Sequence, residues 1–382
     1  MPESTDPLGA LTAALDALCA IDPERLSDRE AIKTAYRQLA RLEAVVTRAS
    51  AAFDAGRGWE GDRARSAAGW IAASTHIPKA MAQRRVRLGR QLRLMDVVEQ
   101  AWLAGDIGEA QVNLLARART PRRSETFIRD EEVLVGEART LRYGYFCRVL
   151  AYWCYRADPD GTEAEAEDDY GARELYLSEG LRGMKVLNGT LDPIGGTILY
   201  DELSRIEAEL FDADWAEARE RVGPGVCGAD LARSPAQRRA DALVEMARRS
   251  GATPEGARMP EPLFSVLVNY ESFAGTICEL ANGTAVTPGS LLRFLDRAWI
   301  ERVVFGSPSR VIDVGARRRL FTGATRRAVQ VRDRECFHEF CDVPADDCQI
   351  DHIEPYAAGG LTVQDNGRAA CDFHNRTRHR RS

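Results

Sequence analysis

The sequence predicts a mostly α-helical body with a small β-hairpin and strand component, followed by a small, metal-stabilised C-terminal module of mixed α+β class. Helical periodicity with start and stop signals dominates the first two thirds of the 382 residues. Short strand-like runs interrupt it only in the middle and later parts of the chain. Four of the five histidines and four of the nine cysteines lie in the last 47 residues. In a reducing compartment such clustering indicates metal ligands before disulfides.

The predicted helices of the body are bounded by recognisable signals. Ser27 and Glu30 have capping-box spacing and predict a helix start, and the apolar period that follows ends at Gly56–Gly58. A second helix holds Trp70 and is broken at Ser74–Pro78. Further helices are predicted over about residues 79–103, 109–119, 199–211 and 236–249.

The remaining segments predict strands, loops and boundaries. The acidic stretch 158–169 is interpreted as a surface loop, and 173–177 with 184–191 as a β-hairpin. Short strands are expected at 264–268, 303–305 and 311–314, and Pro/Gly-rich connections at 223–225 and 253–262. We expect three parts: a mainly helical domain over residues 1–300, a linker over 301–320 and the C-terminal module over 321–382.

Charge and composition exclude several classes. The net charge is −6, which by itself argues against a strongly nucleic-acid-binding surface. From Arg317 onward the charge is +2, while the preceding part carries −8, so phosphate contacts are allowed at the C-terminal end. No run approaches the ~20 apolar residues of a membrane span, and the acidic N-terminus does not resemble a secretory signal. We therefore expect a cytoplasmic protein with no membrane partner.

Arginines crowd the helix that follows Pro78: Arg84, Arg85, Arg87, Arg90 and Arg93. One interpretation is a helix-turn-helix regulator whose arginines meet phosphates. The other is a solvated helix face in a chain whose basic residues are nearly all arginine. Residues 1–300 otherwise hold no Walker loop, no nucleotide fingerprint and no metal-ligand cluster.

The C-terminal cysteines have the spacing of a zinc site. Cys336 and Cys341 form a C-x4-C knuckle, and Cys371 and His374 form a C-x2-H pair. Four such ligands make a closed, structural Zn²⁺ site, and a core this small gains from the ~10–16 kcal/mol that structural zinc can supply. The alternative is a metal-free set of buried thiols. Cys348 is interpreted as a small strand residue that faces the core.

Between these pairs lies a second set of polar residues: Asp351, His352, Asn366 and Asn375. With the Gly359–Gly360 turn and the interleaved zinc ligands, their order and spacing resemble the HNH motif of ββα-metal endonucleases over about residues 320–382. In that family an Asp-His pair lies on the hairpin, the central Asn in the loop, and a His or Asn on the helix.

The resemblance implies an endonuclease that hydrolyses DNA, double-stranded DNA in the first place, and leaves 5′-phosphate and 3′-hydroxyl ends. His352 would be the general base, since imidazole titrates near pH ~6.5. Asp351 and Asn375 would hold one catalytic Mg²⁺ or Mn²⁺ through hard oxygen ligands. Asn366 would brace the loop and orient the imidazole.

Three basic residues of the tail, Arg376, Arg378 and Arg380, either bind nucleic-acid phosphates or form a solvated terminus.

Two local expectations follow. Neighbouring residues of a regular strand point to opposite faces, so the strand should end or bend at Asp351–His352, helped by Pro355. We expect a helix over 367–378 with Asn366 or Asp365 as its N-cap, which would put Cys371 and His374 on one face. The family has an apolar run where this chain has Gly367–Ala370, which weakens the predicted packing of that helix.

The body resembles a helical domain of unknown function that precedes an HNH module in proteins of the mycobacterial repeat-family type. The resembling segments are 68–72, 101–106, 189–193, 238–243 and 312–321 with 325–328. A homo-oligomer is compatible with this organisation. The alternative function is a catalytically inactive, zinc-stabilised nucleic-acid-binding or interaction protein.

Overall fold

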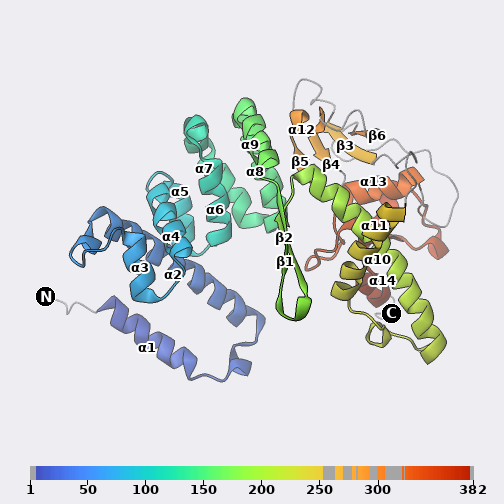
Figure 1. The fold of residues 1–382 in the computed structure, drawn as a ribbon, viewed down its shortest axis with the longest axis horizontal. Helices are drawn as coiled ribbons and strands as arrows, with labels where there is room; N and C mark the ends of the chain where they lie inside the picture. The colour runs from blue at the N-terminus through green and yellow to red at the C-terminus, as the bar shows by residue number, and fades with distance from the viewer. Residues whose placement is uncertain are drawn as a thin grey trace. The chain divides into compact units, whose positions relative to one another are not determined.

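The fold is taken from a computed structural model that describes residues 6–252, 263–269, 278–280, 283–292, 299–305, 321 and 323–378. The chain divides into two compact units, Met1–Asp158 and Pro159–Ser382. The described residues are mostly helical, with two two-stranded sheets and one four-stranded sheet (Figure 1). The predicted class is confirmed. No described helix combines the length and apolarity that a membrane crossing requires.

The regular elements of unit 1 are all helices over its described residues, 6–158. They are α1 (Pro7–Cys19), α2 (Arg29–Ala55), α3 (Ala67–Thr75), α4 (Lys79–Leu92), α5 (Asp96–Ala104), α6 (Glu109–Ala118), α7 (Ser124–Thr140) and α8 (Tyr143–Ala157). Their core includes Trp102, Phe127 and Phe146, which are fully buried. At Gly89 the backbones of α4 and α2 approach so closely that a Cβ would lie 2.6 Å from the Thr47 carbonyl oxygen.

Two helix boundaries of unit 1 differ from the prediction. The helix expected over 79–103 is two helices, because the chain turns at 93–95 and Met95 takes an extended φ of −141°. This break buries Leu92 and Met95 together in the core, a gain in apolar burial that a continuous helix would forgo. The N-cap of α2 is Asp28 and not Ser27: its carboxylate accepts hydrogen bonds from the N–H groups of Glu30 and Ala31.

The first helix of unit 2 corrects a further prediction. The acidic stretch expected to be a loop forms α9 (Pro159–Gly171). Proline is favoured in the first turn of a helix, and Ala and Glu are good helix formers, so local propensity outweighs the repulsion between the acidic side chains. Glu163 of α9 accepts a hydrogen bond from the N–H of Gly289 (3.1 Å) at the start of α12 (Pro288–Leu292).

A two-stranded antiparallel hairpin follows α9, as predicted. It pairs β1 (Glu174–Glu179) with β2 (Lys185–Thr190), from Glu174 opposite Thr190 to Glu179 opposite Lys185 (Figure 1). Both strands are solvent-exposed along their whole length.

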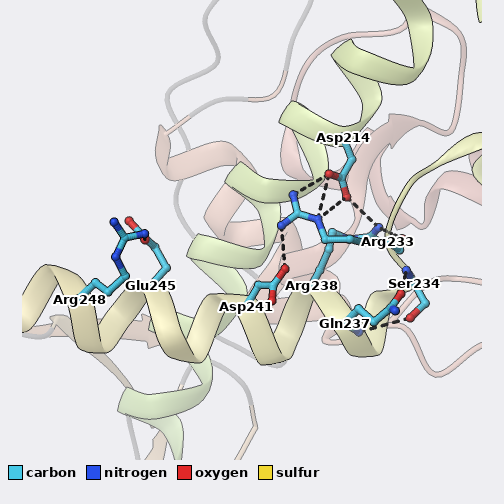
Figure 2. Close-up of polar contacts among 8 residues, drawn as sticks. All are labelled: Asp214, Arg233, Ser234, Gln237, Arg238, Asp241, Glu245 and Arg248. Atoms are coloured by element: carbon cyan, nitrogen blue, oxygen red, sulfur yellow. Dashed lines mark hydrogen bonds and ion pairs between the residues drawn. The ribbon is translucent and has the colours of Figure 1, made fainter. Parts of the chain in front are cut away.

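Two long helices, α10 (Pro193–Val222) and α11 (Pro235–Ala252), pack against each other in unit 2. A buried ion-pair cluster joins them: Asp214 of α10 accepts hydrogen bonds from Arg233, just before α11, and from Arg238 within it (Figure 2). Arg233 also donates to Asp241 at 2.9 Å. Asp214 and Arg238 are almost completely buried, so this pairing fixes how the two helices meet.

A four-stranded sheet has the order β5-β4-β3-β6, from β3 (Leu263–Asn269), β4 (Cys278–Leu280), β5 (Ala285–Val286) and β6 (Trp299–Phe305). Strand β3 is parallel to β6 and antiparallel to β4. A small core of Ile194, Leu280, Val286 and Leu291 joins this sheet to α10 and α12. The strands predicted at 264–268 and 303–305 are confirmed, while the one predicted at 311–314, the connection at 253–262 and most of the 301–320 linker lie outside the described residues.

The C-terminal part of unit 2 has a ββα order after an additional helix. Helix α13 (Gly323–Asp333) precedes the hairpin of β7 (Gln349–His352) and β8 (Gly367–Ala370), and α14 (Asp372–Arg378) follows directly. The hairpin is antiparallel, with Asp351 opposite Arg368 and His352 opposite Gly367. The helix predicted over 367–378 is therefore a strand followed by a shorter helix. Small side chains at Gly367, Ala369 and Ala370 are buried against their surroundings, which favours the paired strand.

Candidate metal centre and adjoining histidine site

The first pair of candidate metal ligands lies on a tight turn after α13. The backbone N–H of Cys336 donates to the carbonyl of Val343 (2.8 Å), and that of Cys341 donates to the carbonyl of His338 (3.0 Å). These bonds close the chain between the two cysteines, so both thiols project from one turn.

The second pair lies where β8 passes into α14. Cys371 immediately precedes the helix and His374 lies in its first turn, where the carbonyl of Cys371 accepts the N–H of Asn375 at 2.8 Å. The N–H of Cys371 points to the Cys336 sulfur at 3.4 Å, which ties the two pairs together. We expected Cys371 and His374 to lie three residues apart within one helix, but the helix begins only after Cys371. Their side chains nevertheless lie close together.

The structure brings all four side chains to one point. Their ligand atoms lie within 4.8 Å of one another. The Cys341 and Cys371 sulfurs are 3.8 Å apart, and Nδ1 of His374 is 3.4 Å from the Cys336 sulfur and 3.2 Å from the Cys371 sulfur. Tetrahedral zinc, with bonds of about 2.0–2.3 Å, separates its ligand atoms by roughly 3.3–3.8 Å. This Cys3His group could therefore hold a structural metal such as zinc.

The protonation of the group responds to its close packing. Burial raises the pKa of Cys336, but the hydrogen bonds that its sulfur accepts from the N–H groups of Cys371 and His338 and from the thiols of Cys341 and Cys371 together lower it. Burial raises the pKa of Cys341 to about 11. Burial and the adjacent His338, whose ring stacks on His374 at 3.9 Å between centroids, lower the pKa of His374. The lowered pKa values of Cys336 and His374 favour the deprotonated forms that bind a metal, and a bound cation would displace the remaining thiol protons.

Cys348 lies outside this group, as the sequence predicted. It is buried with a 1% exposed side chain in the small core beneath the metal ligands. Its sulfur is 3.8 Å from the carbonyl oxygen of Val343. Burial, with the nearby cysteines, raises its pKa to about 12, so it stays a neutral thiol.

His352 is the last residue of β7, so the strand ends where the sequence argument required. Its Nε2 lies 2.9 Å from the hydroxyl of Thr362, a buried side chain of the loop between β7 and β8. The rings of Phe321 and Tyr356 pack on the imidazole at centroid distances of 4.6 and 5.7 Å. Two aromatic rings and one hydrogen bond therefore limit the rotation of the His352 imidazole.

Asp351 contacts a different partner. Its Oδ2 accepts hydrogen bonds from Nε and Nη2 of Arg368 at 3.3 and 3.2 Å, directly across the hairpin. The guanidinium of Arg368 in turn lies 3.8 Å over the ring of Phe337, a residue of the knuckle. In the sequence Arg368 is only a departure from an apolar run, and nothing there indicates this pairing across the hairpin.

Asn366 braces the loop between the strands. Its Oδ1 accepts the N–H of Glu354 at 2.8 Å, and its Nδ2 donates to the carbonyls of Leu361 (2.8 Å) and Glu354 (3.2 Å). Gly360 lies against this side chain: a Cβ there would be 2.0 Å from the Glu354 carbonyl oxygen. The resemblance implied that Asn366 braces this loop, and these hydrogen bonds are consistent with that role. Asn366 is not a helix N-cap, because a strand follows it.

Asn375 faces the hairpin from α14. Its Nδ2 donates to Oε1 of Gln349 at 2.6 Å, while Nε2 of Gln349 donates to Asp372 at 3.1 Å. Gln349 is two residues before Asp351 on β7, hence on the same face of the strand. Gln349 therefore links the helix to the strand face that carries Asp351, a role for which the sequence offered no signal.

Two neighbouring side chains of α13 hold β8 in place. Arg332 donates to the carbonyls of Gln364 (2.7 Å) and Gly367 (2.6 Å), and Asp333 accepts the N–H of Ala369 (2.8 Å). Helix α13 therefore belongs structurally with the candidate metal centre, and the sequence carries no signal for these two bracing residues.

Of the three arginines predicted to bind phosphate, the structure describes the side chain of Arg376 alone. Arg376 is exposed and pairs with Asp372 one turn earlier in α14 at 3.0 Å. The side chain of Arg378 and the whole of Arg380 lie outside what the structure describes.

The arginine-rich helix α4 lies in unit 1. Arg90 pairs with Asp54 (2.7 Å), Arg85 with Glu109 (3.7 Å), and Arg93 donates to the carbonyl of Ala51 (3.0 Å). These contacts attach α4 to α2 and α6, which favours the interpretation of these three residues as structural.

Comparison with known proteins identifies the family of the body. Residues 27–333 match the family described as "Domain of unknown function (DUF222)". This match covers most of the chain, so the protein belongs to that family. No curated protein and no solved structure matches the chain. The match ends three residues before Cys336, so the metal centre follows the matched region.

Proposed function

We propose that the C-terminal module is a metal-dependent endonuclease of the HNH type that hydrolyses DNA phosphodiester bonds and leaves 5′-phosphate and 3′-hydroxyl ends. The observation that carries the proposal is the hydrogen bond from Asn375 on α14 to Gln349 on β7. It supports an arrangement in which Asn375 and Asp351 face one strand surface, with His352 at the strand end.

Asp351 and Asn375 have the donor chemistry that a hard divalent cation requires. Since the Nδ2 of Asn375 donates to Gln349, its Oδ1 would be the atom that binds a cation. A carboxylate and an amide oxygen suit Mg²⁺ or Mn²⁺. When bound, such a cation supplies charge stabilisation for the scissile phosphate and the departing 3′ oxygen.

His352 is the proposed general base. In the tautomer whose Nε2–H donates to Thr362, Nδ1 holds the lone pair that takes a proton from the attacking water. Phe321 and Tyr356 restrict the rotation of the ring, which keeps that lone pair in one direction. Asn366 holds the loop that positions Thr362.

Zinc at the Cys3His group is proposed as the scaffold of the module. Cys336 and Cys341 belong to the knuckle, Cys371 and His374 to the end of β8 and the start of α14, so one ion would join the first and last segments of the module. Cysteine ligands need a reducing environment, which is consistent with the cytoplasmic location that we propose.

The test is nicking of a supercoiled plasmid by the full chain in the presence of Mg²⁺ or Mn²⁺. His352→Asn should reduce the nicking rate by at least a factor of 10² if the imidazole is the base. His76→Asn is the matched control, because His76 is an exposed histidine that ends α3 in unit 1. Equal nicking by wild type and His352→Asn would refute the assignment.

A binding-only protein is the second candidate, favoured by one observation. Arg368 already places a positive charge on Asp351, the residue proposed to hold the cation. A gel shift with the same plasmid, run beside the nicking assay, separates the candidates: DNA binding without nicking by the zinc-loaded wild type indicates the binding protein.

A further inference from the structure

Arg368 is held between two parts of the C-terminal module. Its guanidinium carbon lies 3.8 Å from the ring centroid of Phe337, which belongs to the knuckle. Its Nη2 lies 3.2 Å from the carboxylate of Asp351 on β7, and the side chains of Arg368 and Asp351 are 23% and 13% exposed. The stacking fixes the plane of the guanidinium, so its donors have defined directions.

The pairing leaves part of the donor capacity of Arg368 unused. Both of its contacts reach the same oxygen, Oδ2, at 3.2 and 3.3 Å. A fork-to-fork pair would use two oxygens at about 2.7–2.9 Å. Within the part of the chain that the structure describes, Nη1 of Arg368 donates no hydrogen bond. A planar guanidinium with free donors beside a carboxylate is suited to a second anion, such as the singly charged phosphodiester group of a nucleic-acid backbone.

We propose that Arg368 is a phosphate-positioning residue of this site, held by Asp351 until a divalent cation takes that carboxylate. The proposal rests on the proposed function, because it assigns Asp351 to the cation. Cation and guanidinium compete for Asp351, and a guanidinium released from Asp351 while still stacked on Phe337 presents its fork to a phosphate of the nucleic acid. Arg368 acts on the substrate phosphate by orientation and charge, without proton transfer.

The competition is tested by binding measurements that require no cleavage. Zinc-loaded full-length protein with His352→Asn is titrated with Mn²⁺, followed by the electron paramagnetic resonance signal of free Mn²⁺. Adding Arg368→Gln, which keeps the length of the polar side chain and removes its charge, should tighten Mn²⁺ binding about fivefold, the range of a partly exposed ion pair. Arg248→Gln is the matched control, since Arg248 is an exposed arginine of α11 whose one ion pair among the described residues is with Glu245 of the same helix.

The phosphate contact is tested with a short DNA duplex and the same variants, by fluorescence anisotropy over a series of salt concentrations with Mn²⁺ present. Losing one phosphate contact should weaken binding and lower the slope of log K against log salt by about 0.9. Arg368→Lys, which restores charge without the planar fork, should recover the slope and only part of the affinity.

Each outcome separates the two proposals. Mn²⁺ affinity that is the same with Arg368→Gln and Arg248→Gln overturns the competition, and an unchanged salt slope overturns the phosphate contact. Neither the Mn²⁺ affinity nor the salt slope depends on whether His352 is a base, because both are measured without DNA cleavage. One zinc per chain in every variant shows that the fold is retained.

Discussion

Cys371 and Cys348 are both buried in the C-terminal module, yet only Cys371 belongs to the Cys3His group. Cys348 is therefore a matched control for testing whether Cys371 binds zinc. We expect Cys371→Ser to lose bound zinc and Cys348→Ala to retain about one zinc per chain, as measured by elemental analysis of purified protein. A zinc-free Cys348→Ala that is still folded would argue against the four ligands.

Gly360 is the second residue at which a small change has a large expected effect. A Cβ at this position would lie 2.0 Å from the Glu354 carbonyl oxygen and 2.8 Å from Nδ2 of Asn366. Moving either group away would shift the backbone or break the hydrogen bonds of Asn366. Gly360→Ala should destabilise the module by about 2 kcal/mol or more. Gly225→Ala has open space around its Cβ and serves as the control in thermal unfolding. Equal melting of the two variants would show that the loop adapts.

At the residue scale, sequence spacing predicted the four side chains that converge in the Cys3His group, but not the residues that position them. Cysteine and histidine pairs are recognisable because few other functions need those side chains at that separation. Arg368, Gln349 and Arg332 carry no such signature. Their roles depend on strand register and helix placement, which bring residues 17 to 35 positions apart into contact.

At the scale of elements, the pairing of α10 with α11 depends on one carboxylate. Asp214 is 4% exposed and accepts hydrogen bonds from Arg233 and Arg238 (Figure 2). Asp214→Ala would leave buried guanidinium charge without a counter-ion and should cost about 3 kcal/mol. Glu245→Ala, which removes two partly exposed ion pairs within α11, with Arg248 and Arg249, should cost about 1 kcal/mol or less. The two costs are compared by urea unfolding, and similar values would refute the buried cluster as the determinant.

A second element contact predicts a dependence on pH. Asp130 of α7 accepts hydrogen bonds from Arg129 and from the indole N–H of Trp153 in α8, and these lower its pKa from 3.8 to about 2. A carboxylate with a depressed pKa stabilises the folded state fully above pH ~4, and that stability is lost as the pH falls through its folded value. After allowance for solvent screening the contribution is about 1 kcal/mol.

Comparison of wild type with Asp130→Asn measures the stability that the ionised Asp130 carboxylate contributes. The difference between their urea midpoints, followed by circular dichroism, should be present at pH 6 and shrink between pH 4 and pH 2. Glu132→Gln, an exposed carboxyl change on the same helix, is the control. A difference that is constant over this range would exclude ionisation of Asp130 as its source.

Helices and strands were predictable where local preference and burial agree. The hairpin β1–β2 and helices α3 and α6 follow their sequence signals. At α9, local helix propensity prevailed although the acidic composition indicated a loop. At β8, the opposite occurred: Gly367–Ala370 forms a strand because its pairing with β7 and the backbone bonds from α13 stabilise an extended chain. Such tertiary contacts cannot be read from a four-residue segment.

At the scale of the whole molecule, the two units have different sources of stability. Unit 1 has an extensive apolar core, whereas the C-terminal module has a small core beside its candidate metal ligands. We expect two transitions in calorimetry, of which a zinc chelator lowers only one by more than about 10 °C. Chelation that shifts both transitions equally would show that the units unfold together.

The geometry of the sulfur ligands has a practical consequence for handling the protein. With the ion removed, the thiols of Cys341 and Cys371 are left 3.8 Å apart, close enough for dissolved oxygen to couple them. A sample stripped in air would then fail to reload, which could be mistaken for an irreversible loss of fold. Reconstitution should be done under reductant, and recovery after dithiothreitol treatment distinguishes an oxidised centre from a denatured one.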